Sequence, residues 1–314
     1  MNVQEIASRV EAIREEEEMG ATGLARRALE LLGEMATDPA LPNDSFADLF
    51  LDTARGLGIA RPSVASLSNG VAAVLAAWLE AGGAHNVGAA RAAAADEARR
   101  WIARQDSSLS VIADHAAEVV TGIVITLGYS STVLHALKEC WARGVISGVT
   151  VAESRPRCEG WKTAAALAAR GIPTTLITDA EVGIFAPEAG AALVGAGTIR
   201  PNGALVNGTG TLLLALAARR CRVPFYALAE THKIAPWEER GKRLPPEERD
   251  SRAILPEPIP GVVARNVAFD VTPTRYLTGY ITERGLLDRN DVVALSKEVP
   301  GALMLGLQSP GPGS

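Results

Sequence analysis

Short β-branched runs alternate with helical patterns along the second half of the chain, and this alternation restricts the fold more than any other feature. The runs are continuous and do not alternate between apolar and polar residues, as expected of strands that are buried on both faces of a sheet. They are Thr121–Thr126, Val149–Ala152, Thr174–Ile177, Ala191–Val194 and Val223–Ala227. Helical patterns lie between them, at Ser131–Arg143, Gly160–Arg170 and Leu212–Arg220. Strand–helix–strand units of this length predict a parallel sheet.

The first hundred residues contain helical patterns only. Apolar residues recur at helical spacing, and alanine, leucine, arginine and glutamate, which are good helix formers, are abundant. The predicted helices are Val3–Glu18, Gly23–Met35, Ser45–Leu57, Val64–Glu80 and Ala89–Ala103. We therefore predict an α/β protein, with a helical domain over residues 1–118 and a parallel-sheet domain over residues 119–314.

Composition excludes several classes of protein. Hydrophobic residues make up 47% of the 314, which is enough for a sizeable core, and a net charge of −5 argues against direct nucleic-acid binding. No apolar stretch is long enough to span a bilayer. Cys140, Cys158 and Cys221 have neither a disulfide pattern nor zinc spacing, which predicts a reducing cytoplasm and no metal site.

Ligands of open parallel sheets bind at the carboxyl ends of the strands, so the residues that follow each strand are the candidates for binding. Ser130 and Ser131 follow the first strand and begin a helix, where hydroxyl and N–H groups suit an anion such as phosphate. An ordinary serine N-cap is the alternative. Arg155 follows the second strand, where its guanidinium could clamp a phosphate or form a structural ion pair.

Three further candidates for binding lie elsewhere in the chain. Asn207 opens the segment NGTGT, whose glycines either let a ligand approach the backbone closely or form a tight turn at a helix start. Lys233 follows the fifth strand, where an ammonium group suits a phosphate or an oxyanion. Arg61 precedes a helix of the helical domain and could reach the cleft.

Proton-transferring groups are fewer. Asp179 follows the third strand and could hold a ribose hydroxyl or cap a helix, and Glu153 follows the second strand. His232 is more simply explained as structural or exposed than as a base. Cys158 is the only cysteine near the expected cleft, and nothing in the sequence indicates that it is activated.

Several stretches of the chain, in order, resemble the alpha, beta and delta regulatory subunits of translation initiation factor 2B. They cover roughly residues 55–290, and the coincidence of several ordered motifs makes the resemblance specific. They are ARPSVASLSN, ITLGYSSTV, VAESRPRCEG, IPTTLITDA, LVGAGTIRPNGALVNGTGT and FDVTPTRYLTGYITERG. The same superfamily holds methylthioribose-1-phosphate isomerase and ribose-1,5-bisphosphate isomerase. The resemblance implies an N-terminal helical domain, a Rossmann-like C-terminal domain and dimerisation largely through the latter.

The resemblance also implies where an isomerase of this superfamily would carry its acid and base groups. The family's cysteine, in the loop after the first strand, corresponds to Gly128, and the aspartate of its GAD motif corresponds to Gly197. Glycine has no side chain with which to move a proton. A lysine of the family's NKIGT motif is replaced by Gly208, and an arginine before Gly-Ala by Met19.

Three functions remain open on this basis. The leading hypothesis is a regulatory-subunit-like protein that binds a phosphorylated sugar or nucleotide without the usual isomerase pair. The second is a sugar-phosphate isomerase with relocated groups, and the third is an oligomerisation partner with an empty cleft. We expect a cytoplasmic homodimer or higher oligomer, with no cofactor, no direct nucleic-acid contact and no membrane contact, and a protein partner stays open.

Overall fold

The computed structural model describes residues 1–16, 19–235 and 247–298. These residues form two compact units. The first contains residues 1–16, 19–107, 232–235 and 294–298, and the second contains residues 108–231 and 247–293. The change from one unit to the other falls inside helix α5 (Val87–Val119), and the domain boundary predicted after residue 118 stays a prediction.

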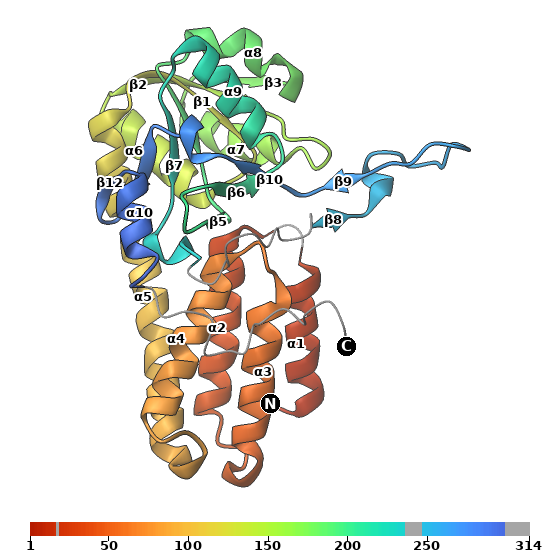
Figure 1. Ribbon diagram of the computed structural model, residues 1–314, viewed down its shortest axis with the longest axis vertical. Coiled ribbons are helices and arrows are strands. Elements are labelled where there is room, and N and C mark those ends of the chain that lie inside the picture. The colour runs from red at the N-terminus through yellow and green to blue at the C-terminus, as the bar shows by residue number, and fades with distance from the viewer. Residues whose placement is uncertain (17–18, 236–246, 299–314) are drawn as a thin grey trace. The chain divides into compact units, whose positions relative to one another are not determined.

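The first unit is helical, as the sequence predicts. Its helices α1 to α4 lie alongside one another (Figure 1). They are α1 (Val3–Glu15), α2 (Ala21–Thr37), α3 (Asn43–Ala60) and α4 (Ala65–Glu80), followed by a 3-10 turn at Gly83–His85 and by α5. The predicted helix to Glu18 ends at Glu15, and Glu17 and Glu18 lie outside the described residues. Asn2 caps α1, because its side chain accepts a hydrogen bond from Glu5 N at 2.9 Å.

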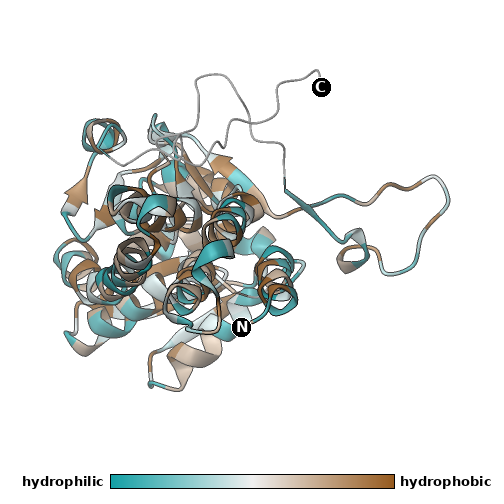
Figure 2. Cartoon of the chain, turned by 90° about the horizontal axis from the view of Figure 1, so that it is seen from below, coloured by the Kyte–Doolittle hydropathy of each residue, from teal (hydrophilic) through white to brown (hydrophobic). Residues whose placement is uncertain are grey.

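Aromatic packing anchors the core of this helical unit. Trp78 is fully buried, and its ring lies 5.5 Å from that of Phe46 and 4.9 Å from that of Phe50. The helices carry hydrophobic residues (brown) beside hydrophilic ones (teal) in Figure 2, the amphipathic pattern that sequence periodicity predicts.

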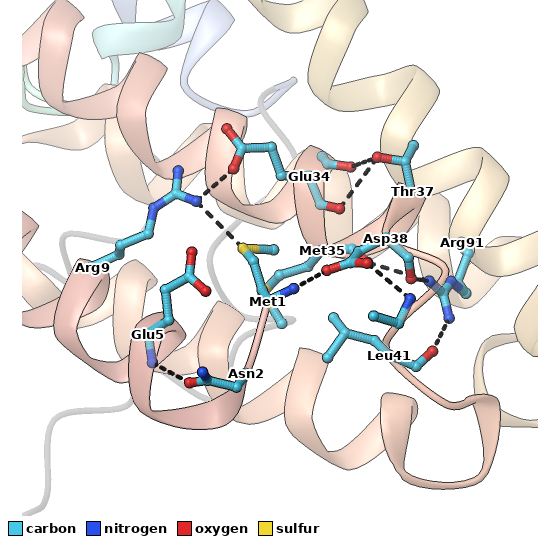
Figure 3. A network of polar contacts seen from close by, with 12 residues as sticks. Met1, Asn2, Glu5, Arg9, Glu34, Met35, Thr37, Asp38, Leu41 and Arg91 are labelled. Carbon is cyan, nitrogen blue, oxygen red and sulfur yellow. Dashed lines mark hydrogen bonds and ion pairs between the residues drawn. The ribbon is translucent and has the colours of Figure 1, made fainter.

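Arg91 of α5 fastens the connection between α2 and α3 (Figure 3). Its guanidinium donates hydrogen bonds to the carbonyl oxygens of Ala36 at 3.0 Å and Leu41 at 2.8 Å, and stacks over the Phe46 ring at 4.2 Å. Asp38, in the same connection, accepts a hydrogen bond from the amino group of Met1. The connection between α2 and α3 is therefore held by hydrogen bonds from α5 and from the amino group of Met1.

The second unit contains a seven-stranded sheet in the order β12-β11-β7-β4-β1-β2-β3. Its strands pair in parallel except for the β11–β12 hairpin. They are β1 (Gly122–Leu127), β2 (Ile146–Ala152), β3 (Thr174–Ile177), β4 (Ala191–Val194), β7 (Phe225–Leu228), β11 (Gly279–Thr282) and β12 (Gly285–Leu287). The fold class is confirmed, and β11 and β12 are strands that the sequence analysis missed.

Helices α6, α7 and α9 pack on this sheet (Figure 1). The α-helices that begin in the second unit are α6 (Ser131–Ala142), α7 (Glu159–Ala168), α8 (Val182–Phe185), α9 (Thr211–Cys221) and α10 (Arg289–Leu295). Two small antiparallel sheets were not predicted. They contain β5 (Thr198–Ile199), β6 (Leu205–Gly208) and β10 (Phe269–Thr272), and β8 (Glu248–Arg249) with β9 (Asn266–Val267).

Parallel pairing brings the carboxyl ends of the central strands to one edge. Leu127 of β1 pairs with Ala152 of β2, and Ala152 pairs with Ile177 of β3. The loops that follow these strands therefore leave the sheet side by side, which is where ligands bind in open parallel sheets. Among the described residues, no helix has the length and apolar character needed to cross a membrane.

Candidate functional site

The loop after β1 is held in one conformation by its neighbours. Gly128 has a φ of +64°, in the left-handed region that favours glycine, and its carbonyl oxygen accepts a 2.6 Å hydrogen bond from Thr163 Oγ1 of α7. Ser130 then caps α6, its Oγ accepting a 3.4 Å hydrogen bond from Val133 N. The N-cap alternative for Ser130 is therefore realised in this structure.

The first turn of α6 presents hydrogen-bond donors that the described residues leave unused. The backbone N–H groups of Ser131 and Thr132 meet no acceptor among residues 1–16, 19–235 and 247–298. Thr132 is only 1% exposed, and its Oγ1 also has no hydrogen-bond partner among the described residues. These unused N–H and hydroxyl donors, together with the positive end of the helix dipole, can bind an anion.

The loop after β4 lies directly against this helix start. A Cβ at Gly195 would lie 2.6 Å from Ser130 Oγ and 2.9 Å from Ser130 Cβ, so glycine is what allows the two loops to touch. Gly197 follows, and its N–H donates to the Val206 carbonyl at 3.0 Å. The loops after β1 and β4, which contain Gly128 and Gly197, therefore lie against one another at this edge of the sheet.

The loop after β2 is organised by Asp179. The Asp179 carboxylate accepts hydrogen bonds from Ser154 N at 2.8 Å and from Arg155 N at 2.7 Å. Asp179 thus positions this loop, a role that the sequence analysis did not consider. The Arg155 side chain is exposed, and its Nη1 lies 3.8 Å from the Sγ atom of Cys158.

We expect Asp179→Ala to lower the free energy of unfolding by about 2 kcal/mol, because two N–H groups lose a charged acceptor. Urea denaturation of the two proteins measures this difference. The matched control is Asp44→Ala, which removes an exposed carboxylate from the first turn of α3 and should change stability by less than about 1 kcal/mol. An equal loss in both variants would contradict the role given to Asp179.

Glu159 is a carboxylate of this site that the sequence analysis missed. A Cβ at Gly128 would lie 3.8 Å from Glu159 Oε2 and 3.3 Å from Ser154 Oγ. Glu159 also pairs with Arg157, whose Nη2 lies 3.3 Å from Oε1. The motif VAESRPRCEG contains Glu159, but its spacing gave no signal, because left-handed backbone at Ser154 and Cys158 turns the chain back toward Gly128.

The other candidates on this loop contribute less. Cys158 precedes α7 with a φ of +54°, and its Sγ lies 3.9 Å from the Pro156 carbonyl oxygen. Glu153 ties the loop to its surroundings through its backbone, since its N–H donates to Ile177 O at 2.9 Å and its carbonyl accepts from Gly160 N at 3.0 Å.

The NGTGT segment is arranged differently from the prediction. Asn207 and Gly208 lie in strand β6, and helix α9 starts only at Thr211, so Asn207 does not open the helix. The Asn207 amide donates to Thr211 Oγ1 at 3.0 Å. At the start of α9, Asp270 of β10 accepts hydrogen bonds from Gly210 N at 2.9 Å and from Leu212 N at 3.0 Å.

Asp270 has an unusual protonation equilibrium. Burial raises the pKa of its carboxyl from 3.8 to about 6, against the opposing effect of hydrogen bonds from Leu212, Gly210 and Thr211. Sequence reasoning missed this residue, although FDVTP contains it, because β10 was not recognised as a strand.

Three predicted site residues belong to the helical unit. Arg61 is 5% exposed and donates to the Glu16 carbonyl, and Lys233 is 2% exposed. The ring of His232 lies 5.0 Å from that of Trp101. Asn69 of α4, which the sequence analysis did not single out, donates to the carbonyl oxygens of His232 and Ile234, both at 2.8 Å, and so fixes the backbone on either side of Lys233.

Known proteins are similar to this chain in sequence over most of its length. A ribose 1,5-bisphosphate isomerase from Archaeoglobus fulgidus is 36% identical over 289 residues, which are 91% of this chain and 90% of that protein. A putative translation initiation factor eIF-2B subunit 2-like protein from Pyrococcus furiosus is 31% identical, over 90% of this chain and 96% of its own length.

Solved structures agree with the sequence comparison. The crystal structure of Pyrococcus horikoshii OT3 translation initiation factor eIF-2B superposes with a TM-score of 0.77 at 32% identity, covering 90% of this chain and 96% of that one. The family model described as Initiation factor 2 subunit family matches residues 17–289. The chain therefore belongs to the Initiation factor 2 subunit family, whose members include eIF-2B-like proteins and sugar-phosphate isomerases.

Proposed function

We propose that this protein binds a phosphorylated sugar or nucleotide, with the phosphate at the first turn of α6, in the manner of an initiation factor 2B regulatory subunit. The observation that carries the proposal is the set of open donors at Ser131 and Thr132 beside the glycine loops at Gly128 and Gly195. A phosphate offers several acceptor oxygens and a negative charge, which both the N–H groups and the helix dipole favour. The exposed guanidinium of Arg155 stands on a loop of the same edge and can add a charge-assisted contact.

We further propose that the bound sugar is not isomerised. Interconversion of an aldose and a ketose phosphate moves a proton between neighbouring carbons, which requires an acid and a base at the reacting atoms. Gly128 and Gly197 offer no such side chain at the two positions that the family resemblance assigns to them. The site would then bind the phosphorylated compound without converting it.

Assembly into a homodimer or higher oligomer in the cytoplasm is part of the proposal. The chain shares its fold with the tetrameric eIF2B-beta2-delta2 complex from C. thermophilum, and the proposal extends assembly from that complex to this chain. The oligomer can be checked by light scattering on the purified protein, where a monomeric mass would count against this part of the proposal.

One observation favours a second candidate, a sugar-phosphate isomerase. The Glu159 carboxylate lies 3.8 Å from the position of a Cβ at Gly128, close enough for a carboxylate to replace a missing acid or base group there. The ribose 1,5-bisphosphate isomerase relative from Archaeoglobus fulgidus supports this alternative. In that case Glu159→Gln should abolish turnover while leaving ligand affinity within a few-fold.

Calorimetric titration and a coupled isomerase assay test these proposals together. Pentose monophosphates, methylthioribose 1-phosphate and nucleoside monophosphates are titrated into the wild type, and unphosphorylated ribose serves as the ligand control. We expect binding of at least one phosphorylated compound and no turnover of methylthioribose 1-phosphate or ribose 1,5-bisphosphate. Turnover would replace the proposal by the isomerase, and the absence of any binding would leave an oligomerisation partner with an empty cleft.

We expect Ser131→Glu to weaken phosphosugar binding by at least about tenfold, since a carboxylate at the α6 start repels a phosphate. The matched control is Ser45→Glu, which introduces the same charge at an exposed serine in the first turn of α3. Titration calorimetry of both variants gives the comparison. Equal affinities in the two variants would show that the phosphate does not bind at the start of α6.

A further inference from the structure

One loop of the second unit stands out from the rest of that unit. It connects β8 to β9, and Figure 1 shows these two strands leaving the body of the unit with the loop extended beyond them. Residues 250–263 are exposed, except for Leu255, which is half-buried. We call residues 250–265 the arm.

The outer part of the arm is apolar. From Ile254 to Ala264 the sequence is ILPEPIPGVVA, in which Glu257 is the only charged residue. Figure 2 shows hydrophobic positions (brown) along this loop. Its most exposed large aliphatic side chains are Ile254, Ile259, Val262 and Val263, with exposed fractions between 46% and 85%. Aliphatic side chains gathered on one exposed loop indicate a contact with another chain.

The base of the arm is fixed by polar contacts between its two strands. β8 and β9 pair in antiparallel orientation. Arg265 Nε donates to Glu248 Oε1 at 3.0 Å, and Asn266 Nδ2 donates to the carbonyl oxygen of Asp250 at 2.8 Å. The arm is therefore a projection with a fixed base, which can present its apolar residues to a partner in a defined position.

Prolines limit the way in which the arm can contact a partner. Pro256, Pro258 and Pro260 stand at alternate positions and lack the N–H group that a strand donates to its neighbour. The edge of the segment that carries these three positions therefore cannot donate backbone hydrogen bonds to a partner's sheet. Recognition along this edge depends on the aliphatic side chains, which require an apolar surface.

The same unit exposes an apolar helix face that matches the arm. Leu213, Leu216 and Arg220 of α9 follow one another at spacings of three and four residues, so they lie on one side of the helix. All three are exposed, as is Ile184 of α8, which packs against α9. These four residues form what we call the α9 face. It is apolar with one cation, whereas the outer arm is apolar with one carboxylate, at Glu257.

One chain thus contains both sides of an interface, a projecting apolar arm and an exposed apolar helix face of complementary charge. In a two-fold symmetric dimer, each arm lies on the α9 face of the other chain, and the contact is made twice. This duplication helps a short segment to reach the roughly 800 Å² per partner that stable interfaces bury. A different protein that covered only the arm would leave the α9 face exposed, so the observations favour a second copy of this chain.

Resting on the proposed assembly of the chain, we infer that residues 250–265 are a dimerisation arm, which places Ile259, Val262 and Val263 on the α9 face of a second copy. Glu257 then lies beside the partner's Arg220. Aliphatic side chains that water surrounds in the single chain become buried in the dimer, and this burial stabilises it. The inference does not depend on phosphosugar binding.

Two charged variants test this arrangement. Val263→Glu puts a carboxylate on the arm and Leu216→Lys puts an ammonium group on the α9 face, and both positions are exposed, so the single chain should fold as before. By analytical ultracentrifugation over a dilution series, we expect each variant alone to have a dimer dissociation constant at least about tenfold above that of the wild type, because each buries an unpaired charge. The control is Val3→Glu, at an exposed valine of α1, which should dimerise as the wild type does.

An equimolar mixture of the two variants gives the sharpest test. A dimer of one Val263→Glu chain and one Leu216→Lys chain has one wild-type contact and one contact that pairs the new carboxylate with the new ammonium group. The mixture should therefore dimerise more tightly than either variant alone. A monomeric wild type would defeat the proposed assembly together with this inference. A wild-type dimer that Val263→Glu leaves intact, or a mixture no tighter than the separate variants, would overturn the inference alone.

Discussion

Replacing Gly160 by alanine should lower the free energy of unfolding by about 3 kcal/mol or more, the effect of a side chain forced into a packed backbone. Gly160 lies in the first turn of α7, directly over the end of β2. A Cβ there would lie 2.9 Å from Glu153 Cα and closer still to the Ala152 carbonyl oxygen. Both are backbone atoms, one at the end of β2 and one in the loop after it, so the helix start must move to make room.

That movement should also damage the site. Gly160 N donates to Glu153 O, and Glu159 precedes it, so the loop after β2 shifts with the helix. We expect Gly160→Ala to lose phosphosugar affinity as well as stability. Denaturant unfolding and titration calorimetry on the same preparation measure both effects.

Gly88→Ala is the matched control for this substitution. Gly88 is likewise the second residue of its helix, α5, and a Cβ there would have no atom within 4 Å. Alanine should be neutral or should stabilise the protein by up to about 1 kcal/mol through its higher helix propensity. A similar loss in both variants would show that the close approach of α7 to β2 is not what constrains residue 160.

Asp270→Asn should stabilise the protein at pH 7.5 by about 3 kcal/mol, because it removes a buried charge. The carboxyl titrates near pH 6 in the folded protein and near its ordinary value of 3.8 in the unfolded chain. A raised carboxyl pKa contributes stability that is complete below about pH 4 and is lost as the pH rises through 6. Above pH 6 the buried carboxylate is ionised in the native state, which lowers the free energy of unfolding. The two pKa values of Asp270 differ by about 2, and each pKa unit corresponds to about 1.4 kcal/mol.

The sign of this prediction is checked by comparing two pH values. The stability advantage of Asp270→Asn over the wild type should shrink by about 2 kcal/mol between pH 7.5 and pH 4.5, since the wild type takes up its proton in this interval. Asp44→Asn, at an exposed position in the first turn of α3, is the control and should show no comparable change. An advantage that stays constant with pH would mean that Asp270 is not the group that titrates near 6.

The parts of the fold that the sequence predicted are those set by local pattern. The runs Thr174–Ile177 and Ala191–Val194 are strands with those bounds, because each is a short run of β-branched or apolar residues that begins directly after Pro173 or Gly190. Helix α5 runs to Val119, well past the predicted Ala103, because its second half mixes polar and apolar residues at a spacing that was not recognised as helical. Strands of two to four residues, such as those of the small sheets, carry too little pattern to identify.

The sequence predicted those site residues whose role depends on neighbours in the chain. It did not predict those that contact residues far away in the sequence. Ser130 and Ser131 lie at a helix start that their own sequence signals. Asp270 reaches a turn 60 residues away, and Glu159 turns back to Gly128 through left-handed backbone, so neither follows from sequence spacing. Asp179 was noticed, but the role that it takes, holding the loop of Arg155, depends on the pairing of β2 with β3.

Phosphorus NMR of the protein mixed with pentose monophosphates and methylthioribose 1-phosphate tests the central claim most directly, because one spectrum reports binding and turnover together. The account predicts a broadened or shifted phosphate signal for at least one compound, its loss in the Ser131→Glu variant, and no ketose phosphate signal after prolonged incubation. Growth of a ketose phosphate signal, or a phosphate signal unaffected by the protein for every compound, would contradict it.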